Sequence, residues 1–106
     1  MNQYQLRIYT MVDVESLNFY KDVVYPRHLD SFKALNITPH GFWTNPDMPT
    51  EFYVLVSYQP DVNMDDVDAA YMVSPGFLDD VRDMDLSRMV SVRGIKLVPS
   101  TGSPLI

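Results

Sequence analysis

The chain has 106 residues, of which 46% are hydrophobic and 21% charged, so it is long enough for one domain with its own core. It contains no cysteine, which excludes disulfides, thiolate nucleophiles and cysteine-ligated zinc. Its net charge of −6 argues against nucleic acid as a partner, because an acidic protein repels phosphate backbones.

The longest apolar run, residues 52–56, is far too short to cross a membrane. The first residues lack a basic region followed by an apolar stretch, so we expect no signal peptide and a cytoplasmic location. Acidic residues concentrate between positions 61 and 85. We interpret them as the solvated face of a helix, with cation binding as the alternative.

The first half of the chain predicts a strand over residues 4–11 from its alternating pattern. A helix follows over 14–35, with apolar residues at steps of three and four. Pro26 lies inside that helix and lacks an amide hydrogen, so we expect a kink between Asp22 and Pro26. Asn36 can end the helix in the left-handed region.

The pattern then predicts strands over 38–44 and 51–58, joined by a proline-containing hairpin loop over 45–50. The second helix starts after Asn63 and is broken where Ser74 and Pro75 form a new cap and first turn. A last strand covers 90–98, and residues 99–106 form an irregular tail.

The order strand, helix, strand, strand, helix, strand predicts an α+β, ferredoxin-like β-α-β-β-α-β domain over residues 1–98. Its sheet has four antiparallel strands, and both helices cover one face. Strand 51–58 is apolar on both sides, with Tyr53 and Leu55 on the side away from the helices. We therefore expect a homodimer joined through the sheet faces.

His28 is the candidate catalytic residue, because it lies on the apolar side of the first helix. One interpretation is a structural histidine that is hydrogen-bonded in the core. The other is an acid, base or ligand contact in a cleft between helix and sheet. Arg27 is interpreted as a surface ion-pair residue, with anion binding as the alternative. His40 is interpreted as a surface or edge residue.

Four aromatic residues complete the predicted ligand pocket around His28, since each has an apolar ring with a polar tip. They are Tyr9, Tyr20, Trp43 and Tyr71. Packing of these rings in the core, with no ligand, is the alternative. The two histidines have no standard metal-ligand spacing, and the isolated glycines form no phosphate loop, so we expect neither a metal nor a cofactor.

Segments Tyr4–Thr10, His40–Thr44, Ser74–Phe77 and Ser103–Leu105 resemble, in order and spacing, motifs of the NIPSNAP family. The resemblance covers nearly the whole chain. It implies the dimeric α+β barrel superfamily, in which two sheets pack face to face and ligands lie between helices and sheet. Relatives in that superfamily include cofactor-free monooxygenases and polyketide cyclases.

Two functions follow as hypotheses. The first is a homodimer that binds a small apolar or aromatic molecule in the predicted pocket, with no established activity. The second is a cofactor-independent monooxygenase or polyketide-cyclase-like enzyme that acts on an aromatic substrate and uses His28 or a tyrosine for proton transfer.

Overall fold

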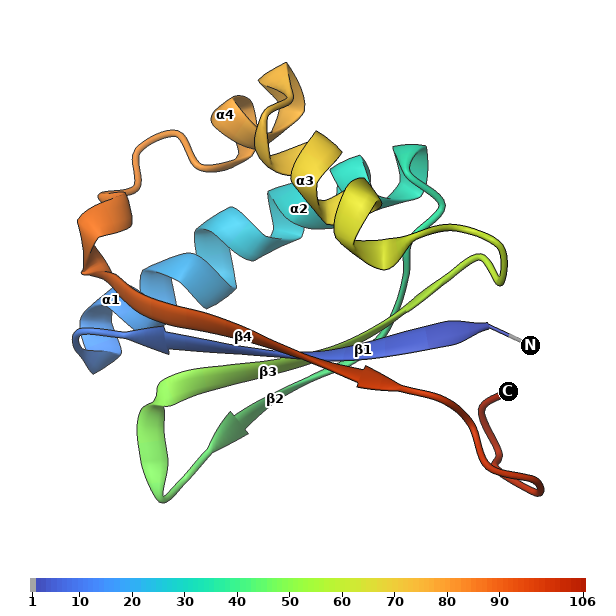
Figure 1. The fold of residues 1–106 in the computed structure, drawn as a ribbon. Coiled ribbons are helices and arrows are strands. Elements are labelled where there is room, and N and C mark those ends of the chain that lie inside the picture. The colour runs from blue at the N-terminus through green and yellow to red at the C-terminus, as the bar shows by residue number, and fades with distance from the viewer. Residues whose placement is uncertain (1) are drawn as a thin grey trace.

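Four strands form one antiparallel sheet in the computed structural model, which describes residues 2–106 (Figure 1). They are β1 (Gln3–Met11), β2 (Thr38–Asn45), β3 (Met48–Tyr58) and β4 (Met89–Leu97). Their spatial order is β2-β3-β1-β4, so the two central strands are β1 and β3. This order and the helices between the strands confirm the predicted ferredoxin-like α+β fold.

The first helical region has three parts: α1 (Val14–Phe19), a π-helical segment η1 (Tyr20–Val24) and α2 (Tyr25–Ala34). The interruption lies where Pro26 predicts it, but it takes the form of a wider turn rather than a simple kink. Pro26 cannot donate a backbone hydrogen bond, and its ring would clash with the carbonyl four residues back in a regular turn. In the wider turn, the amide of Tyr25 bonds to the carbonyl of Tyr20, five residues back. Asn36 then adopts a φ of 57°, as predicted for the end of this helix.

The second helical region is broken at the predicted place into α3 (Met64–Met72) and α4 (Pro75–Asp80). The side chain of Ser74 accepts a hydrogen bond from the amide of Phe77, and Pro75 occupies the first turn. A short 3₁₀ turn, η2 (Leu86–Arg88), leads into β4.

The hairpin between β2 and β3 is tighter than the sequence predicts. Only Pro46 and Asp47 form the turn, and β3 begins at Met48 rather than at Glu51. The side-chain oxygen of Asn45 accepts a hydrogen bond from the amide of Asp47, and this bond closes the turn.

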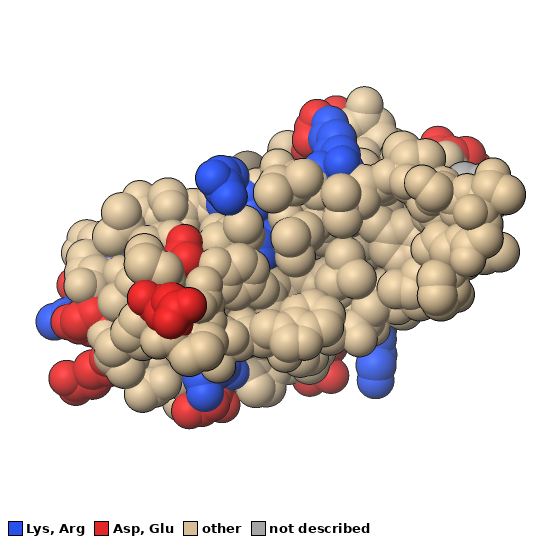
Figure 2. Space-filling model, turned by 90° about the horizontal axis from the view of Figure 1, so that it is seen from below, with Lys and Arg blue, Asp and Glu red and all other residues tan. Residues whose placement is uncertain are grey.

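All helices lie on one face of the sheet, and the other face is open (Figure 1). Leu6 at the centre of the open face lies opposite Leu55 on β3 and Ile95 on β4. Figure 2 shows this open face from below, and uncharged residues form most of it. The row of Leu6, Leu55 and Ile95 gives the centre of this face the apolar character that the sequence predicts.

The core lies between the sheet and the helices. Val54 and Val56 on β3 are fully buried, as are Val24 and Phe32 on the helical side. The chain after β4 has no regular structure and turns back toward the start of β1, where the Tyr4 hydroxyl donates to the carbonyl of Ile106. Within residues 2–106, no helix is long and apolar enough to cross a bilayer.

Candidate functional site

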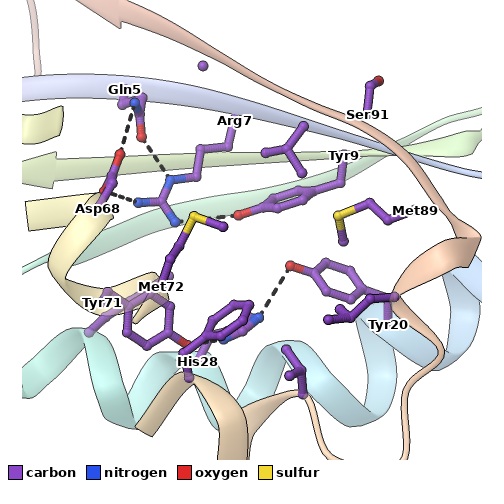
Figure 3. A pocket seen from close by; sticks show the side chains of 16 residues that line it. Gln5, Arg7, Tyr9, Tyr20, His28, Asp68, Tyr71, Met72, Met89 and Ser91 are labelled. Atoms are coloured by element: carbon purple, nitrogen blue, oxygen red, sulfur yellow. Dashed lines mark hydrogen bonds and ion pairs between the residues drawn. The ribbon is translucent and has the colours of Figure 1, made fainter. Parts of the chain in front are cut away.

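A cavity of about 510 Å³ lies between the sheet and the helices, beside the edge strand β4. Most of its wall is apolar, and a few polar groups reach into it (Figure 3). This volume is in the range of small-molecule sites. The lining comes from β1, the helices, η2 and β4: Gln5, Arg7, Tyr9, Tyr20, His28, Phe32, Asp68, Tyr71, Met72, Phe77, Val81, Leu86, Met89, Ser91, Val92 and Gly94.

Four of the five predicted pocket residues line this one cavity: Tyr9, Tyr20, His28 and Tyr71. The fifth, Trp43, does not, and this part of the prediction is wrong. On β2, Phe42 points toward the helices, where its ring lies 5.6 Å from that of Tyr25. Since neighbouring residues of a strand point to opposite faces, Trp43 lies on the open face, with half of its surface exposed.

The widened turn at η1 explains why Tyr20 and His28 meet. In a regular helix, residues four apart drift around the axis, because a turn holds 3.6 residues. The wider π-helical turn offsets this drift, so Tyr20, Val24, His28 and Phe32 are all buried on one side. The Tyr20 hydroxyl consequently lies 3.3 Å from Nε2 of His28.

His28 is held at both ring nitrogens, and its proton can be placed by counting donors. The Tyr71 hydroxyl donates its single hydrogen to Oδ2 of Asp80, so its oxygen is free to accept. It lies against Nδ1 of His28, which must then carry the hydrogen. Neutral His28 therefore has Nε2 unprotonated, and this nitrogen faces the Tyr20 hydroxyl at the cavity.

Asp80 is a buried carboxylate behind His28 that the sequence analysis did not single out. Its Oδ2 accepts hydrogen bonds from Tyr71 and, at 2.6 Å, from Ser31 of α2, and it lies 3.5 Å from Nδ1 of His28. Arg27 donates to the Asp80 carbonyl at 3.3 Å and lies 3.9 Å from Asp83, so it joins α2 to the chain after α4. The interpretation of Arg27 as an ion-pair residue fits this placement.

Burial controls the protonation of these groups. It disfavours the imidazolium and lowers the pKa of His28 below its ordinary value of 6.5, although Asp80 opposes the shift. Burial also raises the pKa of the Tyr20 hydroxyl, and raises that of Tyr71 together with the hydrogen bond to Asp80. At neutral pH the site thus holds a neutral imidazole and neutral phenols.

Arg7 is the centre of a second polar cluster at the cavity, for which the sequence predicts no role. Its Nε donates to Gln5 at 2.8 Å, and its Nη2 donates to Asp68 of α3 at 2.9 Å and to the Tyr58 hydroxyl. Its Nη1 reaches only the Tyr9 hydroxyl, at 3.4 Å. Arg7 therefore places a fixed positive charge at one end of a mostly apolar cavity.

His40 lies on the open face and is remote from this site. Its Nε2 is 2.8 Å from the Ser57 hydroxyl, and its ring lies beside that of Tyr4. Among residues 2–106, no group of three histidine or acidic side chains is placed to hold a metal ion.

Comparison with known proteins supports the family resemblance through the fold. A NIPSNAP family protein of unknown function from Agrobacterium tumefaciens has a TM-score of 0.73 at 19% identity, over 99% of this chain and 94% of its own. A second protein of that family from the same organism has a TM-score of 0.77 at 13% identity, over 99% and 91% of the two chains.

A candidate antibiotic biosynthesis monooxygenase from Nitrosomonas europaea is also similar, with a TM-score of 0.62 at 17% identity over 95% of this chain and 93% of its own. No protein-family model and no curated protein matches the sequence. The chain thus has the fold of solved NIPSNAP proteins, and it shares that fold with monooxygenase-like proteins.

Proposed function

We propose that this protein binds a small, largely apolar or aromatic molecule in the cavity between helices and sheet. The cavity itself carries the proposal, because it combines an apolar wall with a few convergent polar groups. We further propose that the protein acts as a homodimer joined through the open faces of its sheets, since Leu6, Leu55 and Ile95 form an apolar row there.

Fluorescence titration with N-phenyl-1-naphthylamine, an uncharged aromatic dye, tests the binding proposal. We expect saturable binding of one dye per chain. Val92→Trp should weaken it, because Val92 lines the cavity and an indole ring there takes up part of the space. Val90→Trp is the matched control, since Val90 lies on the same strand, is exposed and does not line the cavity. Absence of saturable binding, or equal effects of the two variants, would contradict the proposal.

A second candidate is a cofactor-independent enzyme of the monooxygenase or polyketide-cyclase type. One observation favours it: the unprotonated Nε2 of His28 lies at the cavity, while its Nδ1 is fixed by Tyr71 and Asp80. Such a nitrogen can take a proton from an aromatic substrate as a general base, either through the Tyr20 hydroxyl or directly when the substrate displaces that hydroxyl. The similarity of this fold to that of a candidate antibiotic biosynthesis monooxygenase is consistent with this chemistry.

Proton exchange tests this candidate without knowledge of the substrate. His28 takes a proton from the benzylic carbon of phenylacetone to leave an enolate, and in D₂O the enolate takes up a deuteron. We expect the protein to accelerate this exchange, as followed by NMR, and His28→Leu to remove the acceleration. A rate no higher than that of free imidazole at equal concentration would exclude the role of a general base for this class of substrate.

A further inference from the structure

The N–H groups of the Arg7 guanidinium differ in how well they are hydrogen-bonded. The guanidinium has five N–H groups, and those on Nε and Nη2 point to Gln5, Tyr58 and Asp68. The two on Nη1 have one long contact, 3.4 Å to the Tyr9 hydroxyl. Because Arg7 lines the cavity and its side chain is only 11% exposed, this unused donor capacity lies at the cavity and has little contact with bulk water.

One carboxylate balances the charge of Arg7 at this end of the cavity, but it uses only part of the guanidinium's capacity for hydrogen bonds. Among the described residues that line the cavity, Arg7 is the one cation and Asp68 is the one carboxylate. Asp68 contacts Arg7 through one oxygen and one nitrogen, and the same oxygen also accepts from the Tyr58 hydroxyl. Arginine favours planar, two-point pairing with carboxylates, and Asp68 does not provide it.

The rest of the wall suits an apolar body attached to such an anion. The guanidinium lies over the Phe32 ring, 5.1 Å from its centre, and Met72 also lines the cavity (Figure 3). Beyond these, the wall continues to Met89 and Val92 at the β4 edge. A ligand with one anionic end therefore has its charged group at Arg7 and its apolar part toward β4.

We propose that Arg7 is an anion subsite, and that the ligand of this cavity is an aromatic or aliphatic molecule with a carboxylate or enolate oxygen. The anion accepts from Nη1 of Arg7 and from the Tyr9 hydroxyl, which is free to donate when Tyr25 donates to it at 3.1 Å. This inference rests on the proposed binding function and names the chemical class of its ligand.

Two probes with the same naphthalene ring, one anionic and one neutral, test the inference: 2-naphthoate and 2-naphthalenemethanol, each titrated by calorimetry. We expect the wild-type protein to bind naphthoate at least about tenfold more tightly, as a charge-assisted hydrogen bond requires. Equal affinities would overturn the anion subsite and leave the binding function intact. Binding of neither probe would overturn both.

Two variants then assign the preference to Arg7. Asp68→Asn removes the competing carboxylate, so naphthoate should bind more tightly while the alcohol is unaffected. The double variant Arg7→Gln with Asp68→Asn removes both charges together, so that no unpaired carboxylate remains at the cavity, and the preference for naphthoate should disappear. A preference that persists in the double variant would overturn the role of Arg7, as would a weaker affinity of Asp68→Asn for naphthoate.

Discussion

The Nδ1 atom of His28 lies 3.5 Å from Oδ2 of Asp80. The Tyr71 hydroxyl contacts both groups, so the carboxylate and the phenol together determine which ring nitrogen holds the proton. In neutral His28 the unprotonated Nε2 then faces the Tyr20 hydroxyl at the wall of the cavity. The proposed role of His28 as a general base depends on this placement.

The first prediction concerns this tautomer. Nitrogen-15 NMR of the wild-type protein at neutral pH should show hydrogen on Nδ1 of His28. In Asp80→Ala the Tyr71 hydroxyl loses its acceptor and donates to Nδ1, so the hydrogen should move to Nε2. Asp79→Ala is the matched control, because Asp79 is an exposed neighbour that pairs with Arg82. Hydrogen on Nε2 in the wild-type protein would contradict the proposed geometry.

The second prediction concerns the dependence of stability on pH. The pKa of His28 is lower in the folded protein than its ordinary value of 6.5, chiefly because of burial. The unfolded chain therefore takes up a proton first as the pH falls below 6.5, which favours unfolding until the folded protein is protonated as well.

Urea unfolding between about pH 7.5 and pH 5.5 measures this effect, in a range where most carboxylates remain ionised. The free energy of unfolding should fall more steeply with decreasing pH in the wild-type protein than in His28→Leu. Parallel curves for the two proteins would show that His28 has the same affinity for protons in both states.

A third prediction couples Tyr20 to His28. His28→Leu leaves the buried Tyr20 hydroxyl without its acceptor, which should cost about 1–3 kcal/mol of stability. Adding Tyr20→Phe removes the unpaired hydroxyl, so the double variant should be more stable than His28→Leu alone. Chemical unfolding of the four proteins gives the interaction energy, and additive losses would mean that the contact contributes nothing.

Local rules in the sequence predict most of this fold. Serine is favoured at a cap, proline is favoured in a first turn, and Asn36 tolerates a positive φ, so both helix boundaries could be predicted. Pro26 predicts an interruption because its donor is missing. The π-helical form of this interruption could not be predicted, because it depends on which carbonyl accepts the hydrogen bond from the amide of Tyr25.

The site shows where sequence patterns stop being sufficient. His28 and Tyr20 could be predicted from the apolar side of one helix. Trp43 was misplaced because only one residue of an adjacent aromatic pair can face the helices, and strand register decides which. Because side chains alternate along a strand, Arg7 lies on the same face as Tyr9. This pattern could have predicted that the charge of Arg7 is buried beside the predicted pocket. Asp80 had no such signal, since its burial depends on how α4 packs against α2.

The last prediction tests the homodimer. Wild-type protein at micromolar concentration should have a mass of about twice 12.2 kDa by light scattering. Leu6 lies at the centre of the open face, between Leu55 and Ile95. In a dimer with twofold symmetry each substitution occurs twice in the same interface. Leu6→Lys should therefore weaken association by more than about 4 kcal/mol, through lost apolar burial and buried charge, and give a mass near 12.2 kDa.

Asn18→Lys provides the control for this variant, because it adds the same charge at an exposed position of α1 on the helical side and should remain dimeric. Circular dichroism must show that Leu6→Lys is folded, since a central strand carries the change. A wild-type mass near 12.2 kDa would exclude the homodimer. A folded Leu6→Lys protein that remains dimeric would instead place the interface on another surface, and the apolar row of the open face would need a different partner.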